Sequence, residues 1–210
     1  HVSPTLWARF PITHAAAKDL VGASVVIWTT TPWTIPGNRA VAYGPEIEYR
    51  LYDMPSGDPV SSEWSEIESG AKKIEAPKNR WHMRPGERFL VASHVDILGK
   101  IKEEFGLDLL SRTPLRVLRG EELAGVVTAH PLRGMPEAKG GYDFDVPLLP
   151  GDFVTTEAGT GFVHIAPGHG EDDFNLGRAH GLPVPETVGD DGTYTPQAPG
   201  FVGLHVWKAH

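Results

Sequence analysis

The sequence predicts an α+β fold built around a closed or sharply curved β-sheet, and a β-barrel is the form we expect. Three observations support this fold. Short apolar stretches typical of strands recur about ten times along the chain. Helical periodicity occurs in only two or three segments, to a rough count. The two kinds of segment do not alternate regularly, as they would in a doubly wound α/β protein.

Composition places the chain among ordinary globular proteins. It has 210 residues, of which 40% are hydrophobic and 22% charged, so its core can bury roughly 70% of the surface of the unfolded chain. We expect a single domain over residues 1–210, cut from a longer chain because it begins with His1. No apolar stretch approaches the roughly 20 residues of a membrane helix, and no signal-peptide pattern is found. The absence of cysteine fits a cytoplasmic location.

The formal net charge of −8 is unevenly distributed. Residues 1–120 hold 15 basic and 14 acidic residues, whereas residues 121–210 hold 4 basic and 13 acidic ones. This balance disfavours strong binding of nucleic-acid phosphates by the chain alone. Basic residues gather at 72–88 and 112–119, where solvated surface is a better explanation than a nucleic-acid contact.

In the first quarter of the chain, hydrophobic patterning predicts four strands. Apolar residues alternate from Leu6 to Ile12, which indicates a half-buried strand, and the β-branched stretch Val25–Trp28 indicates a buried one. Further strands are expected at 39–43 and 47–52. The pair Pro36-Gly37 predicts a turn with positive φ at the glycine.

Residues 53–87 are rich in Pro, Gly, Ser, Glu and Lys and lack a sustained period, so we expect a variable excursion from the core, with a short helix at 61–73. A strand at 88–92 and a helix at 95–105 should follow, the helix ending at Gly106. The face of this helix that should turn to the core consists of Val95, Leu98, Ile101, Lys102 and Phe105.

The second half of the chain predicts more strands than helices. Strands are expected at 115–118, 123–129, 152–156 and 162–165. Residues 131–150 carry four prolines and three glycines, which predicts a loop. A helix at 172–180 and a hairpin-type turn at 190–194 complete the expected elements.

Several familiar catalytic templates are absent. The chain has no cysteine nucleophile, no serine in a Gly-x-Ser-x-Gly elbow and no phosphate-binding P-loop. Covalent catalysis is therefore not indicated, and we expect no cofactor.

The stretch from Gly159 to Phe174 is the densest in polar chemistry. It contains His164, His169 and three consecutive acids that end in Asp173. Acids in the first turn of a helix are stabilised by its dipole, by up to about 1 kcal/mol each, but three acids exceed what a cap requires, so binding of a cationic group such as an α-ammonium is an equal alternative. His164 could equally be an ordinary core histidine. The histidine spacing does not match a His-Glu-x-x-His zinc motif, and we expect no metal.

Thr29, Thr30 and Thr31 end the buried strand just before Pro32. Proline holds the preceding residue in extended geometry, so the hydroxyl groups should alternate in direction. The β-propensity of threonine explains this triplet as well as function does. The functional alternative is a wall, together with residues 33–38, that holds a small apolar group and orients a water molecule.

Trp28–Asn38 and Gly159–Phe174, taken together, closely resemble the editing domain of bacterial isoleucyl-tRNA synthetases. Weaker likeness extends over most of the chain apart from 53–87. The related domains for valine and leucine commonly carry arginine where Thr31 stands, which favours the isoleucine family.

The resemblance implies a β-barrel-centred domain inserted in a class I synthetase, with aminoacyl-tRNA deacylase activity. It would hydrolyse mischarged valyl-tRNA(Ile), with valyl-adenylate as a second candidate substrate, and would reject isoleucine. Its partners would be the aminoacylated 3′ end of tRNA(Ile) and the rest of the synthetase chain, with no membrane involved. The competing hypotheses are a metal-dependent hydrolase and a non-catalytic barrel module that positions tRNA.

The same resemblance assigns roles to individual residues. Asp173 would bind the α-ammonium, and His164 would border the side-chain pocket and help to exclude isoleucine. The residues that would bind the aminoacyl ester and terminal adenosine and hold the attacking water are Thr29, Thr30, Thr31 and Asn38. Trp33 and Thr34 would shape the wall. We place catalysis on the three threonines and Asp173, and assign His169 no chemistry.

Overall fold

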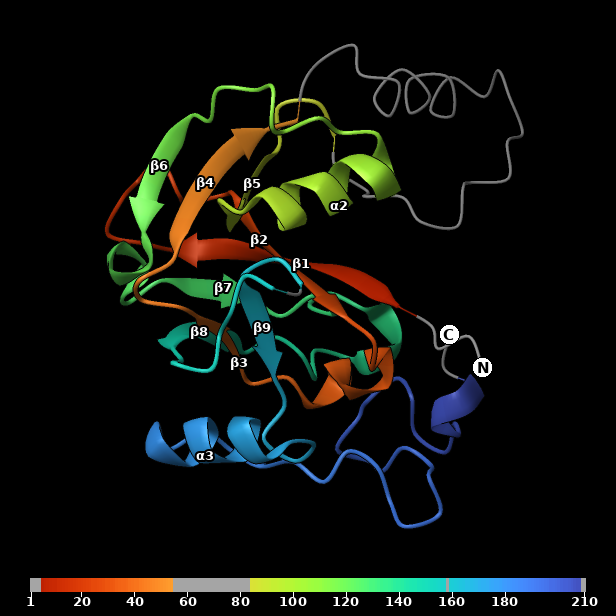
Figure 1. The fold of residues 1–210 in the computed structure, drawn as a ribbon. Coiled ribbons are helices and arrows are strands. Elements are labelled where there is room, and N and C mark those ends of the chain that lie inside the picture. The colour runs from red at the N-terminus through yellow and green to blue at the C-terminus, as the bar shows by residue number, and fades with distance from the viewer. Residues whose placement is uncertain (1–4, 55–83, 158, 209–210) are drawn as a thin grey trace, which may run out of the picture.

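The computed structural model describes residues 5–54, 84–157 and 159–208 (Figure 1). Among these residues, nine strands form one sheet in the order β6-β4-β5-β2-β1-β7-β8-β3-β9. The helix predicted at 61–73 lies outside the described residues. The α+β class is confirmed.

The strands are short, as the sequence predicts. Their bounds are β1 (Leu6–His14), β2 (Ser24–Thr29), β3 (Ala40–Tyr43), β4 (Glu48–Asp53), β5 (Arg88–Ala92), β6 (Arg116–Arg119), β7 (Val127–Ala129), β8 (Asp145–Pro150) and β9 (Phe162–Ile165). The α-helices of the described residues are α2 (Val95–Phe105) and α3 (Glu171–Ala179). The 3-10 helices are η1 (Pro32–Gly37), η2 (Gly120–Leu123), η3 (Pro136–Ala138) and η4 (Val206–Lys208).

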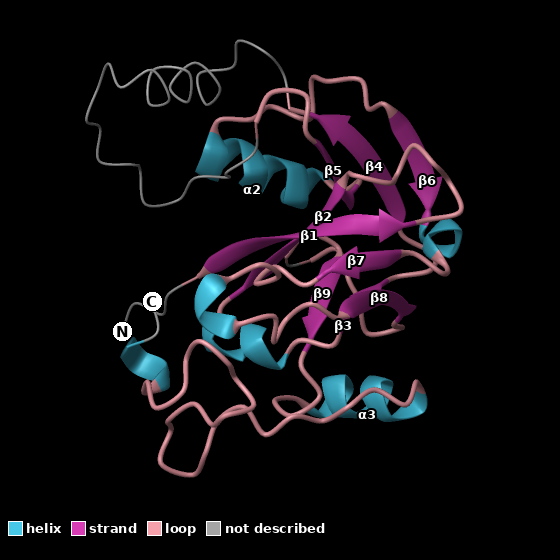
Figure 2. Cartoon of the chain, turned by 180° about the vertical axis from the view of Figure 1, so that it is seen from behind, coloured by secondary structure: helices cyan, strands magenta, loops and turns pink. Residues whose placement is uncertain are grey.

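Strand β1 joins the two halves of the sheet. Its first six residues pair antiparallel with β2, and its last residues pair with β7 after a register shift between Ile12 and His14. On one side of β1, strand β2 continues into a parallel pairing with β5, and on the other side β8 pairs parallel with β3. Figure 2 shows the resulting bend, with α2 beside β2 and β5 and α3 below β3 and β9.

The sheet is not closed into a barrel, contrary to our expectation of a barrel form. Strands β6 and β9 stand at its two ends, and no ladder between them is found in the described part of the chain. The segment before β9 instead approaches the middle of the sheet through Thr160, whose hydroxyl donates to the Val26 carbonyl at 2.6 Å. The Thr160 carbonyl accepts from the Ala92 amide at 2.9 Å. These single bonds replace the strand pairing that would close a barrel.

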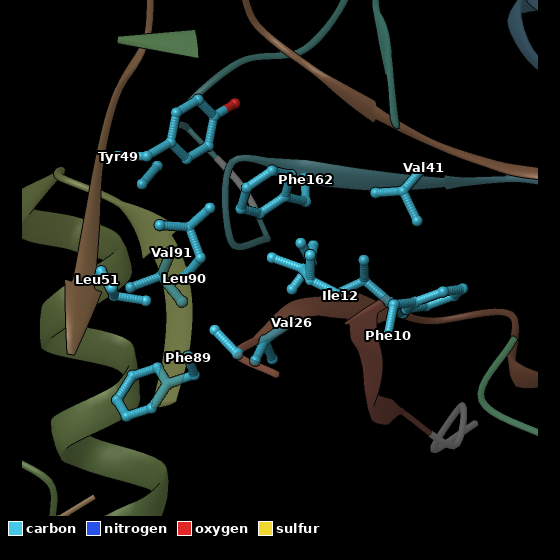
Figure 3. Packing of buried hydrophobic residues seen from close by; sticks show 14 of the residues in the cluster. Phe10, Ile12, Val26, Val41, Tyr49, Leu51, Phe89, Leu90, Val91 and Phe162 are labelled. Atoms are coloured by element: carbon cyan, nitrogen blue, oxygen red, sulfur yellow. The ribbon is translucent and has the colours of Figure 1, made fainter. Parts of the chain in front are cut away.

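The main core lies inside the bend, between α2 and the curved sheet (Figure 3). Its apolar side chains come from strands that are far apart in the sequence. Tyr49 of β4 and Phe162 of β9 are fully buried, with ring centres 4.5 Å apart. Full burial of such side chains is worth about 1.5–3 kcal/mol each, so this core fixes the curvature that carries β9 toward β2.

Helix α2 has the predicted bounds, and Gly106 ends it in the left-handed region, with φ of 71°. The predicted core face is partly wrong. Val95 is 60% exposed and Lys102 is also exposed, while Ile97 is buried together with Leu98. Val95 is the first helical residue, so its side chain precedes the turn that packs on the sheet.

Three predictions in the second half are wrong. Residues 145–150, expected to be loop, form β8, because Val146 and Leu148 alternate into the core while Pro147 tolerates its place beside β7. Residues 152–156, expected to be a strand, form a turn and bends. The strand expected at 123–129 begins only at Val127, after Gly125 with φ of 75° interrupts it.

The ends of the 53–87 excursion lie next to each other. The Met54 amide donates to the Glu87 carbonyl, and the Gly86 amide donates to the Met54 carbonyl, both at 2.8 Å. The chain therefore leaves β4 and returns to β5 at neighbouring points, and residues 55–83 of the predicted excursion lie outside the described residues.

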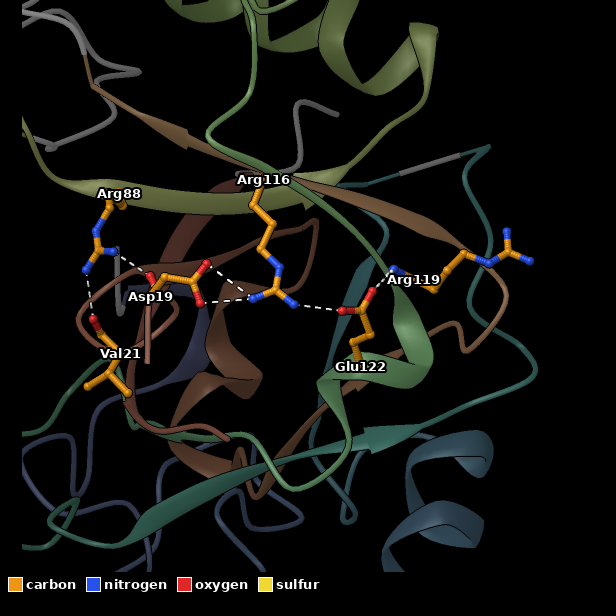
Figure 4. A network of polar contacts seen from close by, with 6 residues as sticks. All are labelled: Asp19, Val21, Arg88, Arg116, Arg119 and Glu122. Carbon is orange, nitrogen blue, oxygen red and sulfur yellow. Dashed lines mark hydrogen bonds and ion pairs between the residues drawn. The ribbon is translucent and has the colours of Figure 1, made fainter. Parts of the chain in front are cut away.

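A polar network holds the connection between β1 and β2 against β5 and β6 (Figure 4). The Asp19 carboxylate accepts from Arg116 at 2.9 Å, and Arg116 also reaches Glu122 at 2.7 Å. Arg88 donates to the Asp19 carbonyl and, at 2.8 Å, to the Val21 carbonyl. Exposed ion pairs contribute roughly 0–1 kcal/mol each, so this network sets local geometry more than stability.

Candidate functional site

A pocket of about 310 Å³ opens where β2, η1, β9 and the start of α3 meet. It unites the two motifs that the sequence singles out, although they are about 130 residues apart. The residues that line it are Trp28, Thr29, Thr30, Thr31, Thr34, Gly159, Phe162, Val163, His164, Ala166, His169 and Asp173. No lysine or arginine is among them. The negative charge of the Asp173 carboxylate is therefore not neutralised by a lysine or arginine of the pocket lining.

The three threonines form the wall at the end of β2. Strand β2 ends at Thr29, and Pro32 starts η1, because proline has no amide hydrogen for the ladder. The buried Thr29 hydroxyl accepts from the Thr31 amide at 3.1 Å and lies 3.2 Å from the Thr31 hydroxyl. Thr30 and Thr31 are exposed, so this wall offers hydroxyl groups to a ligand or a water molecule.

The sequence predicts positive φ at Gly37, and the structure does not show it. Gly37 ends η1 and is not among the glycines with positive φ. Close packing favours the glycine instead. A Cβ at Gly37 would lie 3.2 Å from the His169 ring and 3.3 Å from the Thr187 hydroxyl.

The imidazole of His164 is held by hydrogen bonds at both nitrogens. The Thr34 hydroxyl donates to the Thr31 carbonyl at 2.8 Å, so its oxygen accepts from His164 Nε2, also at 2.8 Å. The Asn38 side-chain amide donates to the Ala40 carbonyl at 2.8 Å and to His164 Nδ1 at 3.2 Å. These partners select the tautomer with hydrogen on Nε2.

Burial, followed by the nearby His169, lowers the pKa of His164 to about 4. The ring is therefore neutral at pH 7. Because Nε2 carries the hydrogen and Nδ1 is occupied by Asn38, no free lone pair remains for proton abstraction. His164 is a rigid part of the pocket wall, which fits its predicted position beside a side-chain pocket.

Asp173 stands opposite, in the first turn of α3. Its Oδ1 accepts from the Ala166 amide at 2.6 Å. Burial raises the pKa of Asp173, and the hydrogen bond from Ala166 offsets part of that rise. A cation in the pocket would lower this pKa again and be stabilised by the carboxylate, because no lysine or arginine in the lining competes for it.

The predicted site residues fall into two groups. Six of them line the pocket: Thr29, Thr30, Thr31, Thr34, His164 and Asp173. Trp33 and Asn38 do not line it. Asn38 is fully buried behind His164, and the Trp33 ring packs edge-on against His169, with ring centres 5.1 Å apart.

Sequence reasoning missed other lining residues. His169 was assigned no chemistry, yet it lines the pocket and its Nε2 lies 2.7 Å from the Thr187 hydroxyl. Trp28 also lines it, and the Lys100 ammonium lies 3.3 Å from the centre of its ring. Their positions within the two motifs were the only available signal, since neither contact is local in sequence.

Two further features bear on the class of site. In the described ranges, no three His, Cys, Asp or Glu side chains group as metal ligands would. Also within those ranges, no helix combines the length and apolar character needed to span a membrane.

Comparison with known proteins adds the family. No family profile matches the chain. Isoleucine–tRNA ligase of Gluconobacter oxydans is 46% identical over 209 residues, which cover 99% of this chain and 19% of that protein. The Caulobacter vibrioides isoleucine–tRNA ligase is 40% identical over 207 residues, covering 98% of this chain and 19% of the relative. The chain thus spans about a fifth of the length of these curated relatives.

Among solved structures, the editing domain of P. knowlesi cytosolic leucyl-tRNA synthetase matches with a TM-score of 0.53 and 14% identity, covering 84% of this chain and 62% of that one. At this identity the match shows the fold alone. The chain therefore has the fold of the editing domains of aminoacyl-tRNA synthetases. Its sequence relatives place it within the family of bacterial isoleucyl-tRNA synthetases.

Proposed function

We propose that the chain is a hydrolytic editing domain that removes valine from mischarged tRNA(Ile) in the bacterial cytoplasm. The observation that carries the proposal is the pocket itself, in which the half-buried carboxylate of Asp173 faces the threonine wall with no lysine or arginine in the lining. Such a pocket suits a small ligand with an ammonium group, an apolar side chain and a polar ester. A valyl ester has all three.

The physical need for such a site follows from the size of the two amino acids. Isoleucine is larger than valine by one methylene. A single hydrophobic pocket that binds isoleucine therefore binds valine less tightly by only about 1–3 kcal/mol, and this pair is the usual worked example of that limit. A second pocket that admits valine and excludes isoleucine by size supplies further discrimination. His164, held at both nitrogens, provides a wall stiff enough for that purpose.

The proposed reaction is attack of water on the aminoacyl ester, with the terminal ribose oxygen as the leaving group. Asp173 binds the α-ammonium, and the hydroxyls of Thr30 and Thr31 hold the water and the ester. An aminoacyl ester is already activated, so positioning and electrostatic stabilisation are sufficient without a protein nucleophile. His164 has no free lone pair for general-base catalysis, so a ribose hydroxyl of the tRNA is the proposed assistant.

Valyl-adenylate is the second substrate of the proposal. It presents the same ammonium group and side chain, joined to a phosphate in place of the ribose ester. The pocket volume of about 310 Å³ lies at the small end of the usual range of roughly 300–1,000 Å³ for ligand pockets. Only the aminoacyl part of either substrate then needs to enter.

The test is deacylation of valyl-tRNA(Ile) and isoleucyl-tRNA(Ile) in EDTA by the full-length synthetase that carries this chain. We expect the wild type to hydrolyse the valyl ester much faster than the isoleucyl ester, and Asp173→Asn to hydrolyse the valyl ester at least tenfold more slowly than the wild type. Asp172→Asn is the matched control, because Asp172 is an exposed neighbour in the same helical turn. It should keep the wild-type rate.

Three outcomes contradict the proposal. If the wild type hydrolyses neither ester, the domain is not a deacylase, and retained tRNA binding would favour a positioning module. If Asp173→Asn is as active as the wild type, the ammonium site is wrong. Loss of activity in EDTA with recovery on adding zinc would favour the metal-dependent hydrolase.

A further inference from the structure

The segment from Pro185 to Thr195 contacts both sides of the pocket, although none of its residues lines it. In Figure 1 it is the blue chain that runs below the sheet beside η1. The sequence predicts only a turn in it, at 190–194. Its contacts with the pocket walls come from two buried side chains, Thr187 and Tyr194.

Tyr194 holds the η1 wall. Its hydroxyl donates to the Trp33 carbonyl at 2.9 Å. Burial raises the pKa of Tyr194 to about 12, so the hydroxyl keeps its hydrogen at neutral pH and remains a donor. Trp33 lies between Thr31 and Thr34, and a shift of this carbonyl would move both pocket residues.

Thr187 holds the opposite wall, formed by the loop between β9 and α3. Its hydroxyl is 2.7 Å from His169 Nε2, and its side chain is fully buried. The loop also approaches the segment at Gly168, where a Cβ would lie only 2.7 Å from the Pro185 carbonyl oxygen. This loop therefore packs closely against the segment at both places.

The contacts close into a ring. The Trp33 and His169 rings meet edge-on at 5.1 Å between the two walls. Within the segment, the Thr195 amide donates to the Thr187 carbonyl at 3.0 Å, and Val188 pairs with Tyr194. The two ends of the segment are thus tied to each other as well as to the walls. The distance between the walls cannot change without breaking one of these contacts.

We propose that the segment Pro185–Thr195 is a brace that sets the width of the pocket, with Thr187 and Tyr194 as positioning residues for substrate selection. The role of the brace in substrate selection rests on the proposed editing function, whereas its role in holding the two walls in place does not. Rejection of isoleucine depends on excluding one methylene, and a wall that yields by a few tenths of an ångström admits it. A brace behind each wall prevents that movement.

The functional test compares hydrolysis of isoleucyl-tRNA(Ile) and valyl-tRNA(Ile) by the full-length synthetase. Tyr194→Phe and Thr187→Val should raise the isoleucyl to valyl rate ratio at least fivefold. Tyr142→Phe and Thr128→Val are matched controls, because each removes a hydroxyl bonded to a backbone carbonyl away from the pocket walls, Pro199 and Val146 respectively. The controls should leave the ratio within twofold of the wild type.

A second measurement does not depend on activity. Hydrogen exchange should accelerate at the Thr34 and Asn38 amides, which close the turns of η1, in Tyr194→Phe and not in Tyr142→Phe. Unchanged exchange in Tyr194→Phe would show that the segment is no brace. Faster exchange with an unchanged rate ratio would refute the role in selection. If the wild type hydrolyses neither ester, the editing function fails while the exchange data still decide the bracing.

Discussion

Asp173 and the residues that place its carboxylate are central at the residue scale. The resemblance pointed to Asp173, but its setting comes from Gly170 and the Ala166 amide, which lie on either side of the carboxylate. Likewise, Asn38 was expected to bind substrate and instead lies behind His164. A residue matched by motif can thus lie one contact away from the pocket lining.

Gly170→Ala tests the placement of this carboxylate. The added Cβ would lie 2.5 Å from Asp173 Oδ2, while φ of −166° at this position is accessible to alanine. We expect a loss of at least tenfold in deacylation, with little loss of folded structure, because the carboxylate must shift. Gly99→Ala in α2 is the control, since its Cβ meets no atom within 4 Å. Equal deacylation rates for Gly170→Ala and the wild type would show that activity does not depend on the exact position of the Asp173 carboxylate.

The buried histidines predict how stability depends on pH. Burial lowers the pKa of His130 to about 3 and that of His164 to about 4, while in the unfolded chain both titrate near 6.5. Between these values the unfolded state binds more protons, so the free energy of unfolding falls as the pH is lowered from about 6.5 toward 4. The slope is up to about 1.4 kcal/mol per pH unit for each histidine. Asp173, whose pKa is raised, contributes with the opposite sign near the acid end.

Urea unfolding at pH 7, 6 and 5 measures this slope. His130→Gln should flatten it, because His130 is 1% exposed and stays neutral in the folded state through this range. Equal free energies of unfolding for the wild type at pH 7 and pH 5 would contradict the assignment.

At the scale of elements, the short strand β9 links the core to the pocket. One of its ends is anchored by the fully buried Thr160, which bonds to β2 and β5, and the other leads into the loop before α3. Strands with a clear apolar pattern, such as the alternating β1 and the continuously apolar β5, were predicted from sequence. Strand β8 was missed because its prolines outweighed the alternation of Val146 and Leu148, which became visible only as pairing with β3 and β7.

Thr160→Val removes the anchor of β9. The substitution preserves the shape of the side chain but takes the hydroxyl donor from the Val26 carbonyl, so we expect a loss of about 1–3 kcal/mol in the free energy of unfolding. Thr13→Val is the control, since its hydroxyl bond to Val127 is exposed and long, at 3.3 Å. Denaturant unfolding of both variants measures the two losses in the free energy of unfolding. Equal losses would mean that the Thr160 hydrogen bond stabilises the fold no more than the exposed Thr13 bond does.

At the scale of the whole molecule, the net charge of −8 and the pocket lining without basic side chains predict weak binding of tRNA by this chain alone. Phosphate contacts from lysine and arginine supply most of the affinity of nucleic-acid binding. We therefore expect residues 1–210 to bind tRNA(Ile) with a dissociation constant above about 1 μM at physiological salt, where non-specific binding commonly lies. Filter binding tests this, with the full-length synthetase as the comparison, and a submicromolar constant for residues 1–210 would overturn it.

By itself, the sequence determined the α+β class, most strand positions, the helices α2 and α3 and the two motifs, because these depend on local periodicity, glycine and proline, and on a resemblance carried by contiguous residues. Only the tertiary structure decided that the sheet stays open, that Trp33 and Asn38 lie outside the pocket lining, and that Thr187 and Tyr194 tie the pocket walls together. Each of these features depends on contacts between segments far apart in the chain. Such contacts are formed by packing of the whole core and leave no periodic signal in the sequence.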